Sequence, residues 1–266
     1  MSHIQTALVL GGGGARGLAH VGVLEVLEEN NIKPDFIVGT SMGAIVGGAY
    51  GLYMNTAQLT AKVRECLARE ALQDIEKRFA DLTSAERADS IWGRFSRFYD
   101  EMQRLYWWNK AAMDQSLVDN VVITGLIQEL VGNATFSDLG VPFYAVAYDL
   151  NSLSDVVLGR GNLASALHAS SAVPGVFEPV RRDEYVLVDG CVDQELPSTT
   201  AYKLGSRAMV AVDVGADSKK SAVGSAAEVM GRVSMARVAS LREQDLKLAD
   251  LVIRPDVGNL HWSEFS

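Results

Sequence analysis

Ser41 lies at the centre of Gly39-Thr40-Ser41-Met42-Gly43, which matches the pattern GxSxG. The apolar run Phe36–Val38 precedes this pentapeptide and a helix-like stretch of small residues follows it, which is the strand-turn-helix context that the pattern requires. In such a turn a strained backbone exposes the serine hydroxyl, and flanking glycines leave room for it. We therefore expect Ser41 to be a nucleophile in acyl transfer; the alternative is a Gly-Ser turn that only caps a helix.

A second glycine-rich stretch, Gly12-Gly13-Gly14-Ala15-Arg16-Gly17, matches GxGxxG. A dinucleotide fold would place an acidic residue at the end of its second strand, whereas Phe36–Val38 runs into Gly39. Consecutive backbone N–H groups without side chains can instead bind the oxygen of a tetrahedral intermediate. We expect an oxyanion hole at Gly12, Gly13, Gly14 and Arg16, with a nucleotide site and a plain tight turn as the alternatives.

A serine nucleophile needs a base, and the four histidines offer few candidates. His3 and His261 are near the termini, His20 falls in the first helix as a packed or capping residue, and His168 is better interpreted as a satisfied structural histidine than as a base. Acidic residues at the carboxyl ends of strands are better placed. Three residues occupy such positions, and the residues alone do not choose among them: Asp149, Asp189 and Asp213.

The elements that would position these residues alternate along the chain. Short apolar runs predict strands, and apolar residues at helical spacing predict helices between several of them. The predicted strands are Thr6–Leu10, Phe36–Val38, Phe143–Asp149, Tyr185–Val188, Ala208–Val212 and Leu251–Ile253, and helices are predicted after Gly17 and Gly43 and over Leu163–Ala169, Ser198–Leu204 and Ala226–Leu248. This order predicts one α/β domain over 1–266, with three αβα layers around a mainly parallel sheet.

The segment at about 56–132 interrupts the alternation, because its pattern is helical throughout, and we expect a helical insertion there. Within it, aromatic residues such as Trp92, Phe95 and Tyr99 recur at helical spacing. Two interpretations of the stretch 84–111 stay open: a stripe that faces the core, or a lid that contacts lipid.

The composition excludes several functional classes. The formal net charge of −9, from 24 Lys plus Arg against 33 Asp plus Glu, argues against nucleic-acid binding and against purely electrostatic attachment to anionic lipid. Two separated cysteines indicate neither a disulfide framework nor a zinc site, so we expect a cytoplasmic protein that needs no metal or other cofactor. No stretch of about 20 apolar residues occurs, so any membrane contact is expected to be peripheral, and the oligomeric state stays open.

Four ordered motifs together resemble the patatin-like phospholipases, in particular bacterial members of about this size. They are Gly12–Gly17 with Arg16, the Gly39–Gly43 turn, the stretch Ala169–Phe177 with Pro174, and the pair Asp189-Gly190. The resemblance covers nearly the whole chain.

The resemblance implies a lipid acyl hydrolase with a Ser41–Asp189 dyad, no catalytic histidine, and an oxyanion hole around Gly13 and Gly14. Cys191 departs from the usual Asp-Gly-Gly or Asp-Gly-Ala, and we expect the dyad geometry to tolerate it. The resemblance implies lipid esters of the phospholipid or lysophospholipid type, and the residues do not choose among phospholipid, lysophospholipid, neutral acylglycerol and thioester. A catalytically weak regulator or scaffold with the same fold is the alternative.

Overall fold

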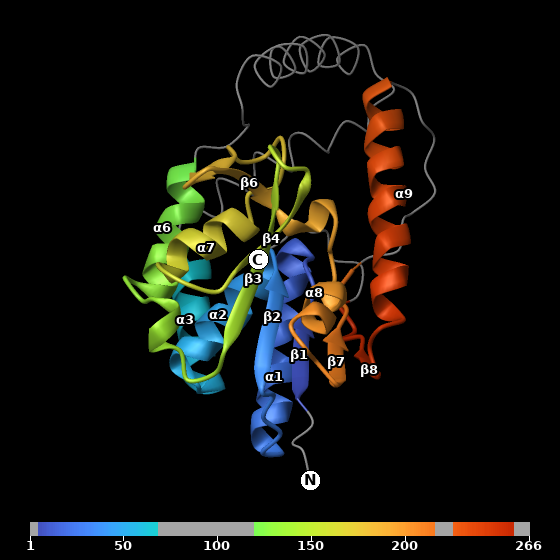
Figure 1. Ribbon diagram of the computed structural model, residues 1–266. Coiled ribbons are helices and arrows are strands. Elements are labelled where there is room, and N and C mark those ends of the chain that lie inside the picture. The colour runs from blue at the N-terminus through green and yellow to red at the C-terminus, as the bar shows by residue number, and fades with distance from the viewer. Residues whose placement is uncertain (1–4, 69–119, 216–225, 258–266) are drawn as a thin grey trace, which may run out of the picture.

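A single sheet runs through the described residues of the computed structural model, which are 5–68, 120–215 and 226–257 (Figure 1). Its eight strands are ordered β5-β6-β3-β2-β1-β7-β8, and β4 pairs with β3 outside this path. The strands are β1 (Thr6–Leu10), β2 (Phe36–Thr40), β3 (Phe143–Asp149), β4 (Ser154–Leu158), β5 (Val180–Arg182), β6 (Tyr185–Asp189), β7 (Ala208–Val212) and β8 (Leu251–Ile253).

The neighbouring strands β3, β2, β1, β7 and β8 are parallel to one another. The pairs β3–β4, β3–β6 and β5–β6 are antiparallel. β1 and β2 are almost completely buried, as expected of parallel strands that helices cover on both faces. The predicted mainly parallel sheet is therefore confirmed. The strand that ends at Asp189 is nevertheless antiparallel to its neighbour β3, which the strand-end argument from sequence did not anticipate.

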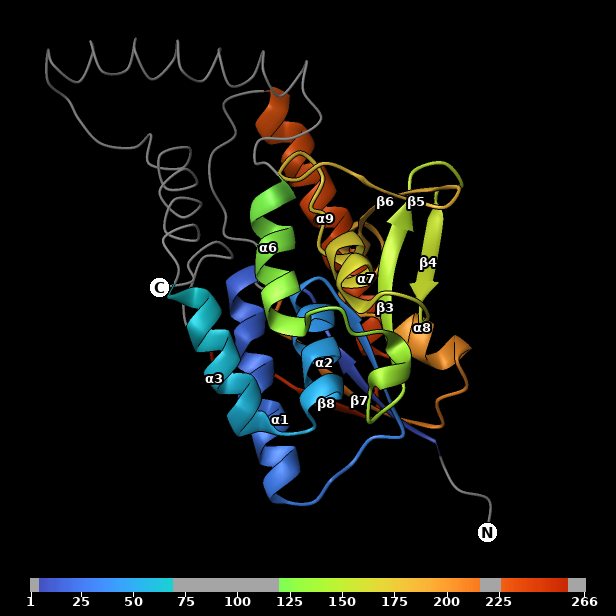
Figure 2. The same ribbon diagram turned by 90° about the vertical axis from the view of Figure 1, so that its left-hand side faces the viewer.

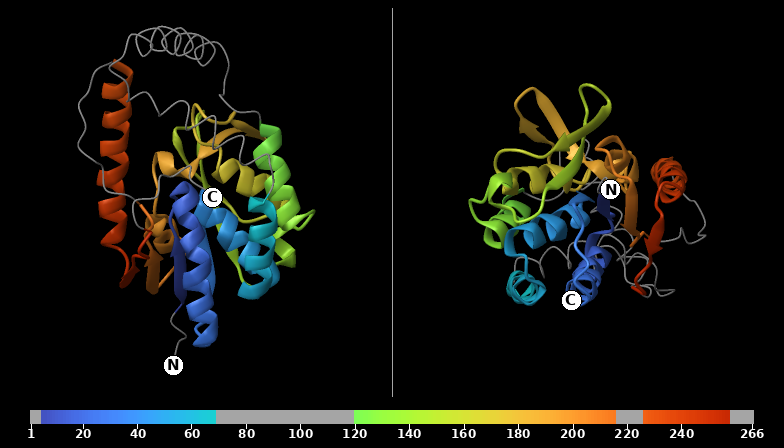
Figure 3. Two further views of the ribbon diagram at one scale, coloured as in Figure 1. Left: turned by 180° about the vertical axis from the view of Figure 1, so that it is seen from behind. Right: turned by 60° about the horizontal axis from the view of Figure 1, so that its bottom comes forward.

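Helices cover both faces of the sheet and complete three layers (Figures 1 and 3). Alternating residues of β1 divide between two apolar clusters: Leu8 and Leu10 pack with α1, α2, α3, α6 and α7, and Ala7 and Val9 pack with α8 and α9. The α-helices are α1 (Ala19–Glu29), α2 (Met42–Tyr53), α3 (Thr56–Leu67), α6 (Asn120–Val131), α7 (Leu163–Ser170), α8 (Ser198–Lys203) and α9 (Ala226–Leu246). No helix in the described ranges combines the length and apolar character that crossing a bilayer requires.

Two strands, β4 and β5, were not predicted from the sequence, and each pairs with only one other strand. β4 exposes Ser154 and Val157, and β5 is only three residues long and contains two arginines. The ends of the expected helical insertion, α3 and α6, are helical as predicted. The aromatic stripe and the rest of 84–111 lie outside the described residues.

Candidate active site

Ser41 occupies a sharp turn between β2 and α2, as the spacing of its glycines predicts. Its backbone has φ 54° and ψ −124°, a strained conformation for a residue with a side chain. A Cβ atom at Gly39 would lie 2.7 Å from the backbone of Ala44, and one at Gly43 would collide with the carbonyl of Leu10. Both glycines are therefore required by close backbone contacts.

The turn is fixed from the side of α7. The amide of Ser41 donates to both Oγ and the carbonyl oxygen of Ser170, at 3.1 and 3.2 Å, and Ser170 Oγ donates to the carbonyl of Val146 at 2.6 Å. Ser170 thus ties the turn to β3. Ser170 lies within the motif Ala169–Phe177, but nothing in the local sequence signals a contact with a residue 129 positions away.

The register of the sheet brings Asp189 to Ser41. β3 lies between β2 and β6; Val146 pairs with Thr40 on one side, and Ala147 pairs with Asp189 on the other. Ser41, which follows Thr40, and Asp189 are therefore level across β3. After Asp189 the chain passes so close to β3 that a Cβ atom at Gly190 would lie 2.5 Å from the Val146 carbonyl oxygen and 3.1 Å from Thr40 Cγ2. The glycine allows β6 to end against the Ser41 turn.

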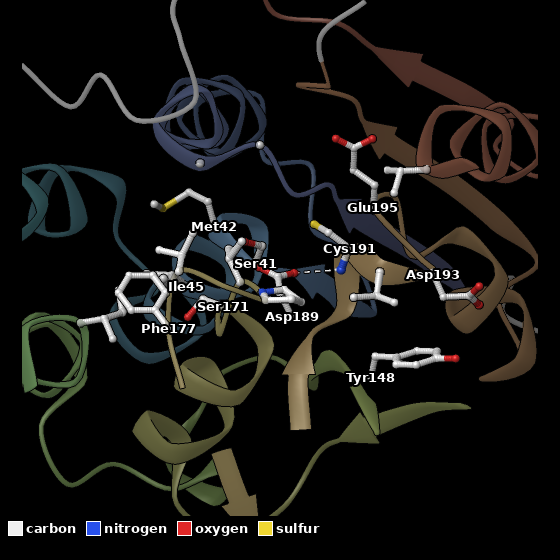
Figure 4. Close-up of a pocket in the computed structure, with 18 of the residues that line it drawn as sticks. Ser41, Met42, Ile45, Tyr148, Ser171, Phe177, Asp189, Cys191, Asp193 and Glu195 are labelled. Carbon is white, nitrogen blue, oxygen red and sulfur yellow. Dashed lines mark hydrogen bonds between the residues drawn. The ribbon is translucent and has the colours of Figure 1, made fainter. Parts of the chain in front are cut away.

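The Asp189 carboxyl group is buried and only partly satisfied. Oδ1 accepts a hydrogen bond from the amide of Cys191 at 2.8 Å, whereas Oδ2 has no hydrogen bond of good geometry to any described residue (Figure 4). Burial raises the pKa of Asp189 to about 6, although the Cys191 amide and the nearby Ser41 side chain lower it in part. A carboxylate with this pKa is a stronger base than an exposed aspartate.

The other two acids at strand ends have different partners. Burial alone would raise the pKa of Asp149, but hydrogen bonds from Ser152 and the Val186 amide outweigh it and lower the pKa to about 2. Burial opposes ionisation of Asp213 too, yet Arg242 and Arg254 bind its carboxylate and lower its pKa. Of these three acids, the structure brings only Asp189 to Ser41.

The glycine-rich stretch crosses the same site. Gly13 and Gly14, where the 3-10 helix η1 (Gly14–Leu18) begins, line the cavity next to Ser41, and their amides make no hydrogen bond to another described residue. The amide of Gly12, however, donates to the carbonyl of Glu195 at 2.7 Å. The expectation that Gly12 offers an amide to an oxyanion is therefore corrected, because that donor is already used. Gly12 instead provides space beside Ser41 and Cys191.

Arg16 also lines the cavity, and its Nε donates to the carbonyl of Gly13 at 3.2 Å. Burial lowers the pKa of Arg16, and the nearby Glu195 partly restores it. The side chain therefore holds the glycine loop in place from within the site.

Neither described histidine lines this cavity. His20 is completely buried, with Nε2 2.7 Å from the Gly11 carbonyl, and burial lowers its pKa to about 4. His168 is partly buried, its pKa is lowered by burial, and its Nε2 has no partner among the described residues. The interpretation of His168 as a satisfied histidine is thus not met at Nε2, which burial of α7 leaves without a partner among the described residues. His3 and His261 lie outside the described residues.

The cavity around Ser41 and Asp189 has a volume of about 780 Å³ and two unlike sides. Figure 4 shows Met42, Ile45 and Phe177 on one side of the Ser41–Asp189 pair, and Tyr148, Asp193 and Glu195 on the other. The apolar side is completed by α6 and by the loop after α7, neither of which sequence reasoning had placed at the site. Their contributions are Ile123, Leu126, Val173, Pro174 and Val176.

Cys191 lies beside the pair, in the 3-10 helix η3 (Gly190–Val192). Burial raises the pKa of its thiol well above the ordinary value, and the Asp189 and Glu195 carboxylates raise it further. A thiol that stays protonated is a poor nucleophile, so Cys191 is not suited to that role.

Comparison with known proteins places the chain in a family. A family model described as Patatin-like phospholipase matches residues 8–201. An uncharacterized NTE family protein of Mycobacterium tuberculosis is 29% identical over 208 residues, which cover 78% of this chain and 30% of that protein. Patatin-like phospholipase domain-containing protein 6 of Homo sapiens is 27% identical over 211 residues, which cover 79% of this chain and 13% of that protein.

Among solved structures, VipD from Legionella pneumophila aligns with a TM-score of 0.43 and 13% identity, covering 92% of this chain and 55% of that one. The chain spans less than a third of the length of either sequence relative. Because the family model matches well over half of the residues, the chain belongs to the patatin-like phospholipase family.

Proposed function

We propose that this protein is a serine acyl hydrolase that cleaves carboxylic esters of lipids, of the phospholipid or lysophospholipid type, with Ser41 as nucleophile and Asp189 as base. The observation that carries the proposal is the register across β3, which brings the strained turn of Ser41 and a buried carboxylate together in one cavity. Family membership supports the choice of lipid esters over other acyl compounds.

In the first half-reaction, Asp189 accepts the hydroxyl proton of Ser41 while the oxygen attacks the ester carbonyl carbon. Oδ2 suits this role, because it lacks another partner among the described residues. The amides of Gly13 and Gly14 are proposed to bind the oxyanion, each donor contributing about 3 kcal/mol to the transition state. Collapse of the tetrahedral intermediate passes the proton from Asp189 to the leaving alcohol and leaves an acyl-Ser41 ester.

In the second half-reaction, Asp189 removes a proton from water, and the resulting hydroxide attacks the acyl-Ser41 carbonyl. The new intermediate expels the Ser41 alkoxide, which recovers the proton from Asp189, and the fatty acid leaves. No step uses a histidine, in agreement with the position of His168 outside the lining of the cavity.

The test combines fluorophosphonate labelling, with the modified residue mapped by mass spectrometry, and hydrolysis of p-nitrophenyl butyrate. We expect the label on Ser41 in the wild type, and loss of hydrolysis in Ser41→Ala and in Asp189→Asn. His168→Ala is the matched control and should keep activity within a few-fold. Retained activity in Asp189→Asn together with loss in His168→Ala would replace the dyad by a triad. A folded protein that neither takes the label nor turns over esters would support a regulatory role instead.

A further inference from the structure

A second, smaller cavity lies behind the apolar side of the Ser41 site. It measures about 100 Å³ and lies between α2, α3 and α6, three helices that pack against one another (Figure 2). The residues that line this cavity but not the Ser41 cavity include Val46, Val63, Cys66, Leu67, Ile127 and Leu130. All of these side chains are apolar or weakly polar, so the cavity offers nothing to a charged or strongly hydrogen-bonding ligand.

The two cavities share a wall. Met42, Ile45, Ile123 and Leu126 line both the large cavity around Ser41 and the small cavity between the helices. Met42 directly follows Ser41, and Ile45 lies one helical turn further along α2. A chain attached to Ser41 Oγ therefore meets this wall first when it runs along α2.

The opposite side of the site does not suit an alkyl chain. Asp193, Glu195 and Tyr148 line it. An apolar chain placed there would exclude water from the two carboxyl groups, and loss of their hydration is unfavourable. The polar alcohol half of an ester fits there better. The asymmetry thus orients an ester, with its acyl chain toward α2 and α6 and its leaving group toward η3.

We infer that the cavity between α2, α3 and α6 binds the distal methylene groups of the acyl chain and selects esters by chain length. The inference rests on the proposed function, because it needs an acyl group on Ser41. Its volume of about 100 Å³ is room for only a few methylene groups, given that one water occupies about 30 Å³ in the liquid. Each methylene buried there is expected to raise kcat/KM about fourfold.

The first test reduces the volume of the cavity with a larger side chain on α3. Val63→Phe fills it, whereas Ala61→Phe adds the same ring to the same helix at an exposed position outside the lining. We measure kcat/KM for p-nitrophenyl esters of butyrate, octanoate and dodecanoate. The ratio of dodecanoate to butyrate should fall at least tenfold in Val63→Phe and stay within twofold in Ala61→Phe. An unchanged ratio in active, folded Val63→Phe would overturn the inference.

A second measurement needs no variant of the cavity. Ser41 of the wild type is labelled with a dodecyl or an ethyl fluorophosphonate, and the rate of Cys66 methylthiolation by methyl methanethiosulfonate is followed by mass spectrometry. Cys66 lines the cavity, so the dodecyl adduct should slow its reaction at least fivefold relative to the ethyl adduct. Equal rates would refute chain binding there. Failure to form either adduct would instead count against the proposed function.

Discussion

Gly12 lies directly against the thiol of Cys191: a methyl group at position 12 would collide with Sγ of Cys191 and would lie 3.3 Å from Cβ of Ser41. The cysteine that distinguishes the Asp-Gly-Cys motif is thus accommodated by a glycine 179 residues earlier in the chain. The contact links the glycine-rich loop, the nucleophile turn and the end of β6.

Gly12→Ala should therefore lower kcat/KM for a short-chain ester by at least about tenfold, because either the glycine-rich loop or the Ser41 turn must shift by tenths of an ångström. Cys191→Ala removes Sγ, so the double variant should recover part of this loss. A double-mutant cycle measures the coupling, which we expect to exceed about 1 kcal/mol. Strictly additive effects would show that the two residues do not constrain each other.

The raised pKa of Asp189 predicts the acid limb of the pH–rate profile. Only the ionised carboxylate accepts a proton, so kcat/KM should fall about tenfold per pH unit below about pH 6 and level off above it. Ester hydrolysis followed in a pH-stat measures this profile. Because burial also lowers the pKa of His168, His168→Ala is the control and should leave the midpoint unchanged. A midpoint that disappears in that variant would assign the limb to the histidine.

The same pKa shift predicts that the proposed base destabilises the fold. The pKa of Asp189 is raised from 3.8 to about 6, so the folded state favours the protonated form. Protonated Asp189 therefore contributes stability to the folded state below about pH 4, and this contribution is lost as the pH rises through about 6. At pH 8 the buried charge should cost up to about 3 kcal/mol. Urea unfolding should show Asp189→Asn gaining stability over the wild type between pH 4 and 7; a difference independent of pH would contradict the shift.

The sequence predicted those parts of the fold that are apolar on both faces. β1, β3 and β7 have the predicted bounds, because strands buried under helices on both sides are apolar along their length. The edge strand β8 was also predicted, from its apolar run, although Leu251 is exposed. β4 and β5 were missed because their apolar runs are short: only Val156–Leu158 in β4, and a single valine in the three-residue β5.

The candidate site was predictable to the extent that it depends on local geometry. The glycine spacing around Ser41 specifies a turn, and the strand ends reduced the acids to three. The choice of Asp189 among them depends on long-range register, namely the antiparallel pairing of Ala147 with Asp189. The sequence pattern predicts this strand but reveals neither its orientation nor its register. The hydrogen bond from Gly12 to Glu195 likewise arises only when distant segments meet.

Strain at Ser41 predicts an unusual order of stability among its variants. With φ at 54°, Ser41→Gly relieves the turn whereas Ser41→Ala retains the strain, so the glycine variant should be more stable by about 1 kcal/mol, or 2–4 °C in Tm. Ser165 in the first turn of α7 is the control, because at a helical position glycine should be less stable than alanine, by up to about 1 kcal/mol. Differential scanning calorimetry measures both pairs. The same order at both positions would mean that the Ser41 turn is not strained.

The ion pairs of Asp213, an acid near the site, are predicted to stabilise the fold. Arg242, with a side chain 9% exposed, and Arg254, 61% exposed, both bind its carboxylate, at 2.8 and 3.0 Å. Arg242→Met should cost about 3 kcal/mol of unfolding free energy, because it leaves a buried carboxylate underpaired, whereas Arg254→Met should cost less than about 1 kcal/mol. The lowered pKa of Asp213 means that its ion pairs stabilise the protein above the unfolded pKa and are lost as the pH falls. The loss of unfolding free energy caused by Arg242→Met, measured by urea unfolding, should therefore become smaller toward pH 3. A loss that does not change with pH would show that Arg242 stabilises the fold by packing alone.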